Sequence, residues 1–267
     1  MIRSAKRIGK GVVVLAVLGY FFPKFVLFYL VCGLYDVSRN ANLGFEIFEK
    51  YFFGNGVLTW LLSPFNIVLD ILSLPNVNKG VYRLEDLPPS HQSEIRRLID
   101  SAHKQDVVAR VQAVAEDQKR SMFFFKWYGA DVETVVDIPA FREKYKFVKT
   151  IGVSVFNKRQ STSQHFGPLR ATLRVLYNIN DMDDDGAYIV VGNVTNYWRT
   201  SKLFIFDDTL LHQSFNETDK VRYCLFVDIM RPTPAPAVLA WVVSVIKRLL
   251  STGGNALLYG NWKVFKR

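Results

Sequence analysis

The sequence predicts a mainly β protein with flanking helices, in which a double-stranded β-helix, or jelly roll, follows N-terminal membrane-associated helices. Two observations predict this fold class. Between residues 147 and 229, short runs rich in β-branched and aromatic residues alternate with turn residues, as in jelly rolls and related barrels. Before residue 80, two apolar runs approach the length of about 20 residues that spans a bilayer.

Residues 1–80 are expected to form a membrane anchor, most simply a helical hairpin. The first apolar run, residues 11–34, follows four basic residues and is interrupted once, at Pro23 and Lys24. A kinked or tilted span tolerates one lysine whose stem reaches the interface. The second run, residues 57–74, predicts either a second span or an interfacial helix.

The charge distribution gives the expected orientation of this hairpin. Residues before the first apolar run carry a net charge of +4, and those between the two runs carry −1. By the positive-inside bias, the N-terminus and the chain after residue 75 then face the cytoplasm. A cleaved signal peptide is the alternative, but no A-x-A cleavage site follows the apolar run.

Residues 81–232 are expected to form the main domain. The segment 83–117 is polar and carries an apolar stripe at Ile95, Leu98 and Ile99, which predicts an amphipathic helix. The chain then changes to short β-rich runs separated by turn residues. The predicted strands are 148–156, 171–177, 188–191, 202–206 and 222–229.

Residues 233–267 are expected to form an amphipathic membrane-surface helix followed by a basic tail. A proline-rich stretch ends the β-domain, and the apolar residues 238–250 then predict a helix. Two tryptophans and three basic residues of this segment are typical of a contact with an anionic membrane surface. They are Trp241, Trp262, Lys263, Lys266 and Arg267.

The formal net charge of +10 indicates an anionic partner. An anionic membrane surface is favoured over nucleic acid, because the basic residues cluster beside apolar segments and no nucleic-acid-binding motif is present. The two cysteines, Cys32 and Cys224, lie in a predicted membrane helix and a predicted strand, so no disulfide is expected. This composition fits a reducing cytosol. The sequence predicts no oligomeric state.

Two of the four histidines are each followed by an arginine in a strand-like run. Arg174 follows His165 by nine residues, and Arg222 follows His212 by ten. Two imidazoles can bind Fe(II) and two guanidiniums can hold a dicarboxylate beside it, so this pairing predicts an oxygenase. Such sites usually add a carboxylate two residues after the first histidine, but Gly167 stands there. Each residue taken alone also has a purely structural interpretation. His165 would be a turn histidine, His212 a partly buried strand histidine, and the two arginines surface residues on an edge strand.

The pattern resembles the aspartyl/asparaginyl β-hydroxylase family of Fe(II)- and 2-oxoglutarate-dependent dioxygenases over roughly residues 120–232. It is most similar to the bacterial lipid-modifying branch, which contains the lipid A acyl-chain hydroxylases and the ornithine-lipid hydroxylases. The segments that carry the resemblance are Phe125-Lys126-Trp127-Tyr128-Gly129, Ser154, His165, Gly167-Pro168, Leu173-Arg174, Val191-Gly192-Asn193, Trp198, Phe206-Asp207-Asp208, His212, Asn216, Thr218-Asp219, Arg222, Val227-Asp228-Ile229 and Arg231-Pro232.

The resemblance implies that His165 and His212 are iron ligands and that 2-oxoglutarate and O₂ are cosubstrates. In the protein-hydroxylating members a glycine also replaces the carboxylate ligand and water fills its place, which Gly167 matches. Lipid A hydroxylases carry an acid at this position, so the chain departs from them. Asp208 is expected to orient His212 or a metal-bound water.

The resemblance also implies how the cosubstrate is held. Arg222 and Ser154 bind the carboxylate of 2-oxoglutarate that is far from the metal, and Arg174 reaches the carboxylate near it. A histidine usually follows that arginine by two residues, where this chain has Leu176. One cosubstrate contact is therefore expected to be missing or to be supplied by a neighbour, Tyr177 or Asn178.

We therefore expect a membrane-anchored dioxygenase that hydroxylates the acyl chain of a membrane lipid of the lipid A or ornithine-lipid type, at C2. Its expected place is the bacterial inner membrane, with the catalytic domain facing the cytoplasm. Hydroxylation of Asp or Asn in a protein is the first alternative, favoured by Gly167. A non-catalytic jelly-roll scaffold at the membrane is the second, suggested by Leu176 and the absent carboxylate ligand.

Overall fold

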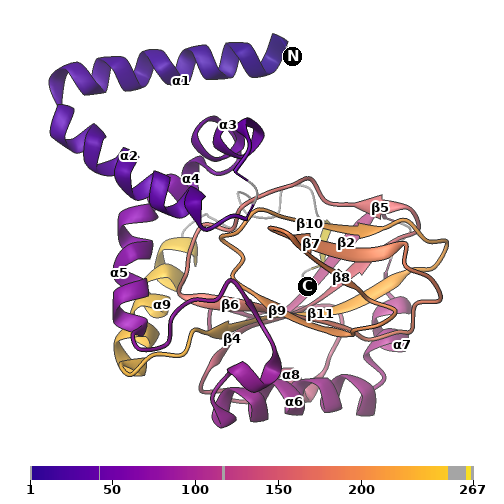
Figure 1. The fold of residues 1–267 in the computed structure, drawn as a ribbon. Helices are drawn as coiled ribbons and strands as arrows, with labels where there is room; N and C mark the ends of the chain where they lie inside the picture. Colours follow the sequence, from indigo (N-terminus) through magenta and orange to yellow (C-terminus); the bar gives the residue numbers. More distant parts are fainter. Residues whose placement is uncertain (1, 42, 116–117, 252–262, 266–267) are drawn as a thin grey trace.

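Two β-sheets packed face to face occupy the centre of the structure, and helices surround them (Figure 1). The computed structural model describes residues 2–41, 43–115, 118–251 and 263–265 of the chain. The larger sheet has the order β1 (Val81–Tyr82), β9 (Leu203–Phe206), β6 (Thr172–Asn178), β11 (Arg222–Met230), β4 (Val148–Phe156), β2 (Arg120–Trp127) and β12 (Lys263–Phe265), and β3 (Ala130–Asp131) pairs with β2. The smaller sheet has the order β5 (Gln160–Ser161), β10 (His212–Asn216), β7 (Ala187–Val191) and β8 (Val194–Tyr197).

The strands from β4 to β11 are nested as in a jelly roll. β4 pairs with β11 in the larger sheet, β5 pairs with β10 in the smaller sheet, and both pairings are antiparallel. The chain therefore passes back and forth between the two sheets, whose inner faces share an apolar cluster. The prediction of a mainly β jelly roll with flanking helices is confirmed in this part.

The outer face of the larger sheet is covered by helices that follow the N-terminal region. They are α6 (Pro89–Lys104), α7 (Val107–Gln112) and α8 (Pro139–Arg142), and the short 3-10 helix η1 (Leu84–Asp86) precedes them. Ile95, Leu98 and Ala102 of α6 are buried against the sheet, while Ile99 is partly buried. The stripe predicted from the sequence is therefore the face with which α6 packs on the sheet.

The described N-terminal residues form a chain of separate helices. They are α1 (Ile2–Phe21), α2 (Pro23–Ser38), α3 (Phe45–Phe53), α4 (Val57–Leu61) and α5 (Ser63–Ser73). The first apolar run is divided at Phe22, because Pro23 begins α2 without an amide hydrogen that could continue the hydrogen bonds of α1. Among the described residues, no helix is at once long enough and apolar enough to cross a membrane. The predicted transmembrane helices are therefore not supported.

Helices α4 and α5, which cover most of the predicted second span, residues 57–74, pack against the β-domain. The hydroxyl of Thr59 donates to the carbonyl oxygen of Gly167 at 3.0 Å. The side-chain amide of Asn66 donates to the carbonyl oxygen of Pro168 at 3.1 Å. Apolar side chains of α5 and β11 also share a buried cluster. This segment is therefore in direct contact with the loop that follows the first predicted iron ligand.

The C-terminal segment begins with α9 (Pro236–Ser251), which corresponds to the helix predicted at residues 238–250. Its buried side chains pack beside α5, whereas Trp241 is 66% exposed. Lys263 belongs to β12, which pairs in parallel with β2, so this part of the expected basic tail forms a strand. The other predicted tail residues, Trp262, Lys266 and Arg267, lie outside the described residues.

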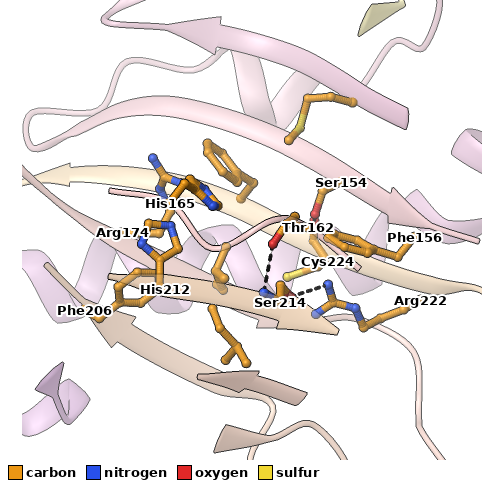
Figure 2. Close-up of a pocket in the computed structure, with 14 residues that line it drawn as sticks. Ser154, Phe156, Thr162, His165, Arg174, Phe206, His212, Ser214, Arg222 and Cys224 are labelled. Carbon is orange, nitrogen blue, oxygen red and sulfur yellow. Dashed lines mark hydrogen bonds between the residues drawn. The ribbon is translucent and has the colours of Figure 1, made fainter. Parts of the chain in front are cut away.

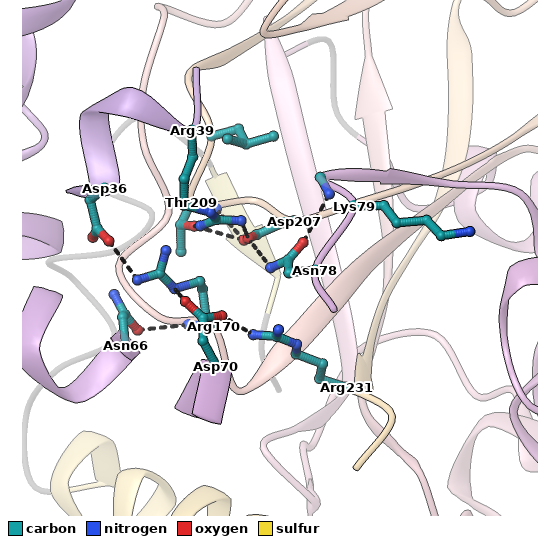
Figure 3. A network of polar contacts seen from close by, with 12 residues as sticks. Asp36, Arg39, Asn66, Asp70, Asn78, Lys79, Arg170, Asp207, Thr209 and Arg231 are labelled. Carbon is teal, nitrogen blue, oxygen red and sulfur yellow. Dashed lines mark hydrogen bonds and ion pairs between the residues drawn. The ribbon is translucent and has the colours of Figure 1, made fainter. Parts of the chain in front are cut away.

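A buried cluster of charges joins the N-terminal helices to the β-domain (Figure 3). The guanidinium of Arg170 donates to Asp36 of α2 at 2.5 Å, and its Nε lies 3.4 Å from Asp70 of α5. The second oxygen of Asp70 pairs with Arg231 at 2.5 Å. Two carboxylates within the N-terminal helices are therefore matched by arginines of the β-domain.

Replacing Arg170 by Ala is expected to lower the free energy of unfolding by about 3–5 kcal/mol, because Asp36 would stay buried without its cation. Urea denaturation followed by circular dichroism measures this change. Arg159→Ala is the matched control, since Arg159 forms an exposed ion pair with Asp219, and exposed ion pairs contribute little to stability. Equal losses in the two variants would contradict a structural role for the buried pair.

Candidate active site

A cavity of about 100 Å³ lies between the two sheets (Figure 2). It is lined by both predicted histidines, both predicted arginines and Ser154, together with hydroxyl-bearing and apolar side chains. The further lining residues are Met122, Phe156, Thr162, Leu176, Ile189, Phe206, Ser214, Cys224 and Phe226. The structure thus gathers into one cavity five residues that are far apart in the sequence.

His165 and His212 face each other across a short antiparallel bridge. The amide of each residue donates to the carbonyl oxygen of the other at 3.0 Å, and the ring centroids are 4.2 Å apart. In both rings Nδ1 lies 2.8 Å from a backbone oxygen, that of Ser163 for His165 and that of Leu210 for His212. Because a carbonyl oxygen only accepts, Nδ1 carries the proton and Nε2 keeps its lone pair.

Burial lowers the pKa of both histidines, and it lowers that of His212 well below the usual value. The two rings are therefore neutral at physiological pH, as metal ligation by imidazole requires. Two adjacent neutral rings with free Nε2 lone pairs fit a ferrous ion. Among the described residues, no cluster of three or more His, Cys, Asp or Glu side chains could hold a metal ion.

The Asp208 carboxyl group occupies the space that a side chain at position 167 would need. A Cβ atom built on Gly167 would overlap Cγ of Asp208 and would lie 2.5 Å from its Oδ2. The amide of Gly167 also donates to the backbone oxygen of Asp208 at 2.6 Å. Because Gly167 has no side chain, the Asp208 carboxyl group can lie against the loop that follows His165.

Asp208 is an unusual carboxyl group because of its surroundings. Burial raises its pKa to about 7; Arg174 opposes this shift, whereas Asp228 and Asp207 add to it. The guanidinium of Arg174 donates to Asp208 at 3.0 Å and to Asp228 at 2.7 Å. Asp208 can thus hold or release a proton on a carboxyl oxygen near neutral pH.

Arg174 lines the cavity, as the prediction for the near carboxylate requires, but two of its donors are engaged by these acids. Leu176 also lines the cavity. The two residues after it do not, because the hydroxyl of Tyr177 contacts His103 and the amide of Asn178 donates to the backbone of Asn180. Neither residue is therefore placed in the cavity to supply the contact of the missing histidine.

Arg222 lies at the other end of the cavity from the histidines (Figure 2). It is 1% exposed, and one nitrogen donates to the hydroxyl of Ser214 at 2.9 Å. Its Nε and Nη1 are buried without a hydrogen-bond partner among the described residues. The guanidinium lies 4.2 Å from the ring centroid of Phe156 and 5.3 Å from that of Trp198.

Burial lowers the pKa of Arg222 to about 10, which is still far above physiological pH. A buried cation with two unused donors is costly, at several kcal/mol, unless an anion pairs with it. A planar guanidinium binds a carboxylate or a phosphate group through two parallel hydrogen bonds. This end of the cavity is therefore suited to a carboxylate ligand.

The hydroxyls beside Arg222 include two that the sequence did not reveal. Ser154 was predicted, and its hydroxyl donates weakly to the backbone of Cys224 at 3.3 Å. Ser214 and Thr162 were missed, although Ser214 follows His212 by two residues in β10 and so lies on the same face of the strand. That spacing is the signal that would have identified Ser214. Thr162 accepts from the amide of Ser214 at 3.0 Å, a contact that no local pattern predicts.

Comparison with known proteins identifies a family for this arrangement. Residues 90–232 match the family described as aspartyl/asparaginyl beta-hydroxylase. An ornithine lipid ester-linked acyl 2-hydroxylase of Rhizobium tropici is 30% identical over 138 residues, which cover 50% of this chain and 49% of that protein. Aspartate beta-hydroxylase domain-containing protein 2 of Rattus norvegicus is 30% identical over 88 residues, covering 32% of this chain and 25% of that protein. The chain thus matches half or less of each relative's own length.

Solved structures give a weaker likeness. A crystal structure of an oxidoreductase of the 2OG-Fe(II) oxygenase family from Burkholderia pseudomallei aligns with 12% identity and a TM-score of 0.33, covering 49% of this chain and 79% of that one. At this TM-score the likeness supports no inference about activity.

Gly167→Ala is expected to displace the Asp208 carboxyl group, because the new methyl group would overlap it. We expect a loss of about 1–3 kcal/mol in the free energy of unfolding, typical of an overpacked interior, together with weaker Co(II) binding. Urea denaturation and isothermal titration calorimetry measure the two effects. Gly19→Ala in α1 is the control, because nothing lies within 4 Å of its added methyl group. Unchanged stability and metal binding in Gly167→Ala would show that Asp208 does not depend on this glycine.

Proposed function

Because the chain belongs to the aspartyl/asparaginyl β-hydroxylase family, we propose that it is an Fe(II)- and 2-oxoglutarate-dependent dioxygenase that hydroxylates the acyl chain of a membrane lipid. One observation carries the catalytic part of this proposal. A pair of neutral imidazoles and a buried guanidinium with two unused donors lie at opposite ends of a single cavity. A metal-chelating dicarboxylate would use both ends at once.

The residues of the chain then have separate tasks. His165 and His212 would hold Fe(II) through Nε2, and Arg222 with Ser214 would bind the far carboxylate of 2-oxoglutarate. When bound, the iron, 2-oxoglutarate and O₂ together supply the oxidising power for hydroxylation of an unactivated carbon. The protein keeps this site dry: the aromatic rings around Arg222 and the apolar inner faces of both sheets exclude water.

Arg174 and Asp208 are assigned a positioning role beside the metal. Arg174 holds the Asp208 carboxyl group in place and partly offsets its charge. A carboxyl group with a pKa near 7 can accept a hydrogen bond from, or donate one to, a water or cosubstrate oxygen as the reaction requires. We propose Ser154 as a second hydroxyl on the far carboxylate, next to Ser214.

Two observations support a lipid substrate. The first is the similarity to an enzyme named for hydroxylating position 2 of an ester-linked acyl chain of ornithine lipid, from which we propose C2 as the site of reaction. The second is a set of exposed apolar side chains at about one-turn spacing on α2 and α5, of the kind that marks an interaction surface. They are Phe25, Phe28, Val31 and Leu34 on α2, and Phe65, Val68 and Ile71 on α5.

We propose that these faces, with exposed apolar side chains of α1 and α9, contact an anionic membrane surface, which the net charge of +10 favours. An acyl chain partly withdrawn from that membrane would be the substrate. The proposed setting is the cytoplasmic face of a bacterial inner membrane, where 2-oxoglutarate is available.

A protein substrate is the second candidate, and Gly167 favours it. The resemblance implies glycine at this position in the protein-hydroxylating members, and a second relative is named as an aspartate beta-hydroxylase domain-containing protein. In that case an Asp or Asn side chain would occupy the place of the acyl chain.

His165→Ala and His212→Ala are each expected to abolish iron-dependent turnover of 2-oxoglutarate, because a single imidazole cannot hold the metal.

Arg222→Gln is expected to raise the KM for 2-oxoglutarate at least about 30-fold, the equivalent of ~2 kcal/mol for a lost buried charge pair. Coupled assays of succinate formation measure both effects, with Arg159→Gln as the surface control. Turnover that survives in both histidine variants would overturn the assignment of the two histidines as metal ligands. Absence of turnover in the unmodified protein would instead leave a non-catalytic scaffold as the better description.

Lipid extracts from cells that express the chain are expected to contain a lipid one oxygen atom heavier than in cells that express His212→Ala. Mass spectrometry of the released fatty acids then locates the hydroxyl group, expected at C2. Purified protein offered ornithine lipid and Asp- or Asn-containing peptides in parallel separates the two candidate substrates. Hydroxylation of peptides alone would overturn the lipid assignment and leave the dioxygenase assignment in place.

A further inference from the structure

The loop between β9 and β10, residues 207–211, carries the acid beside Gly167 and directly precedes the second histidine, His212. The backbone oxygen of Leu210 accepts from Nδ1 of His212 at 2.8 Å, and Asp208 projects from the same loop. The conformation of this loop therefore sets both the direction of one imidazole and the position of the Asp208 carboxyl group.

Two residues at the end of α2 hold this loop. The guanidinium of Arg39 donates to Asp207 at 2.6 Å and to the hydroxyl of Thr209 at 3.3 Å (Figure 3). The side-chain oxygen of Asn40 accepts from the amide of Leu211 at 2.9 Å. Three of the five loop residues are thus bound by two consecutive residues that directly follow α2.

The Arg39 contact is strong because it is buried. Asp207 has no exposed surface, and the side chain of Arg39 is 13% exposed. Besides Arg39, Asp207 accepts from Asn78 at 2.5 Å and from the amide of Thr209 at 3.0 Å. Within the described residues, Arg39 is the cation that pairs with Asp207, so its removal would leave a buried negative charge one residue from Asp208.

The helix that presents these residues is itself fixed to the β-domain. Asp36, three residues before Arg39, pairs with Arg170 at 2.5 Å and accepts from the hydroxyl of Tyr51 at 2.9 Å. Residues 36–40 lie outside the segment 90–232 that matches the family, so nothing in that match accounts for them.

We propose that Arg39 and Asn40 are positioning residues of the metal site, so that α2, from outside the family-matched domain, completes that site. The proposal rests on the proposed function, in which His212 is a metal ligand. Residues that orient metal ligands typically change metal affinity about 10–100-fold when replaced. Helix α2 also exposes apolar side chains, so the surface proposed to meet lipid and the residues that hold the loop are adjacent in the chain.

The test is Co(II) binding by the purified full-length protein, followed by calorimetry and by the visible absorption of the bound ion. Arg39→Gln is expected to weaken binding about 10-fold or more and to alter the absorption bands. Arg39→Lys keeps the charge opposite Asp207 and is expected to recover most of the affinity. Arg7→Gln is the matched control, because Arg7 forms an exposed ion pair with Glu49 on the surface of the same N-terminal region.

Asn40→Ala is the second variant, since it removes one neutral hydrogen bond and should fold even if Arg39→Gln does not. It is expected to weaken Co(II) binding at least about threefold, the equivalent of a neutral hydrogen bond. Wild-type affinity and an unchanged spectrum in folded Arg39→Gln or Asn40→Ala would overturn the inference. Absence of Co(II) binding by the unmodified protein would instead overturn the proposed function, so the two failures are distinguishable.

Discussion

The site depends on one backbone contact, the antiparallel bridge between His165 and His212. Two mutual hydrogen bonds at 3.0 Å bring together residues 47 positions apart and make both rings project into the same cavity. Neighbouring backbone oxygens then fix the proton of each ring on Nδ1, so Nε2 of each ring keeps its lone pair. Because the jelly roll places β10 opposite the loop of residues 163–168, the pairing of the two imidazoles follows from the nesting of strands.

The second constraint is the cost of isolated charge inside the sandwich. Among the described residues, the other two buried arginines, Arg170 and Arg231, each pair with a carboxylate. Arg222 instead has a serine and two aromatic rings. A buried guanidinium without an anion costs several kcal/mol of stability, so a cavity that contains one is suited to an anionic ligand. The geometry thus separates the chain's structural cations from the one suited to a cosubstrate.

Much of the fold and of the site could be predicted from the sequence, because strand β4 and the paired histidines have strong local patterns. Strand β10 was missed because four of its five residues are polar and none is β-branched. The position of Asp208 against Gly167 depends on a contact between loops 41 residues apart, which no local pattern encodes. The hydropathy pattern overestimated the N-terminal spans. It counts apolar residues but registers neither the helix break at Pro23 nor the ion pair of Asp36 with Arg170.

The end of α2 has a practical consequence for work with this protein. A shortened version that begins after residue 41 would be attractive for crystallisation, since it removes the most apolar part of the chain. Such a fragment would also discard Arg39 and leave Asp207 uncompensated in the interior. Poor yield or lost metal in that fragment would then reflect a missing internal support, and trimming should stop before Asp36 so that its bond with Arg170 survives.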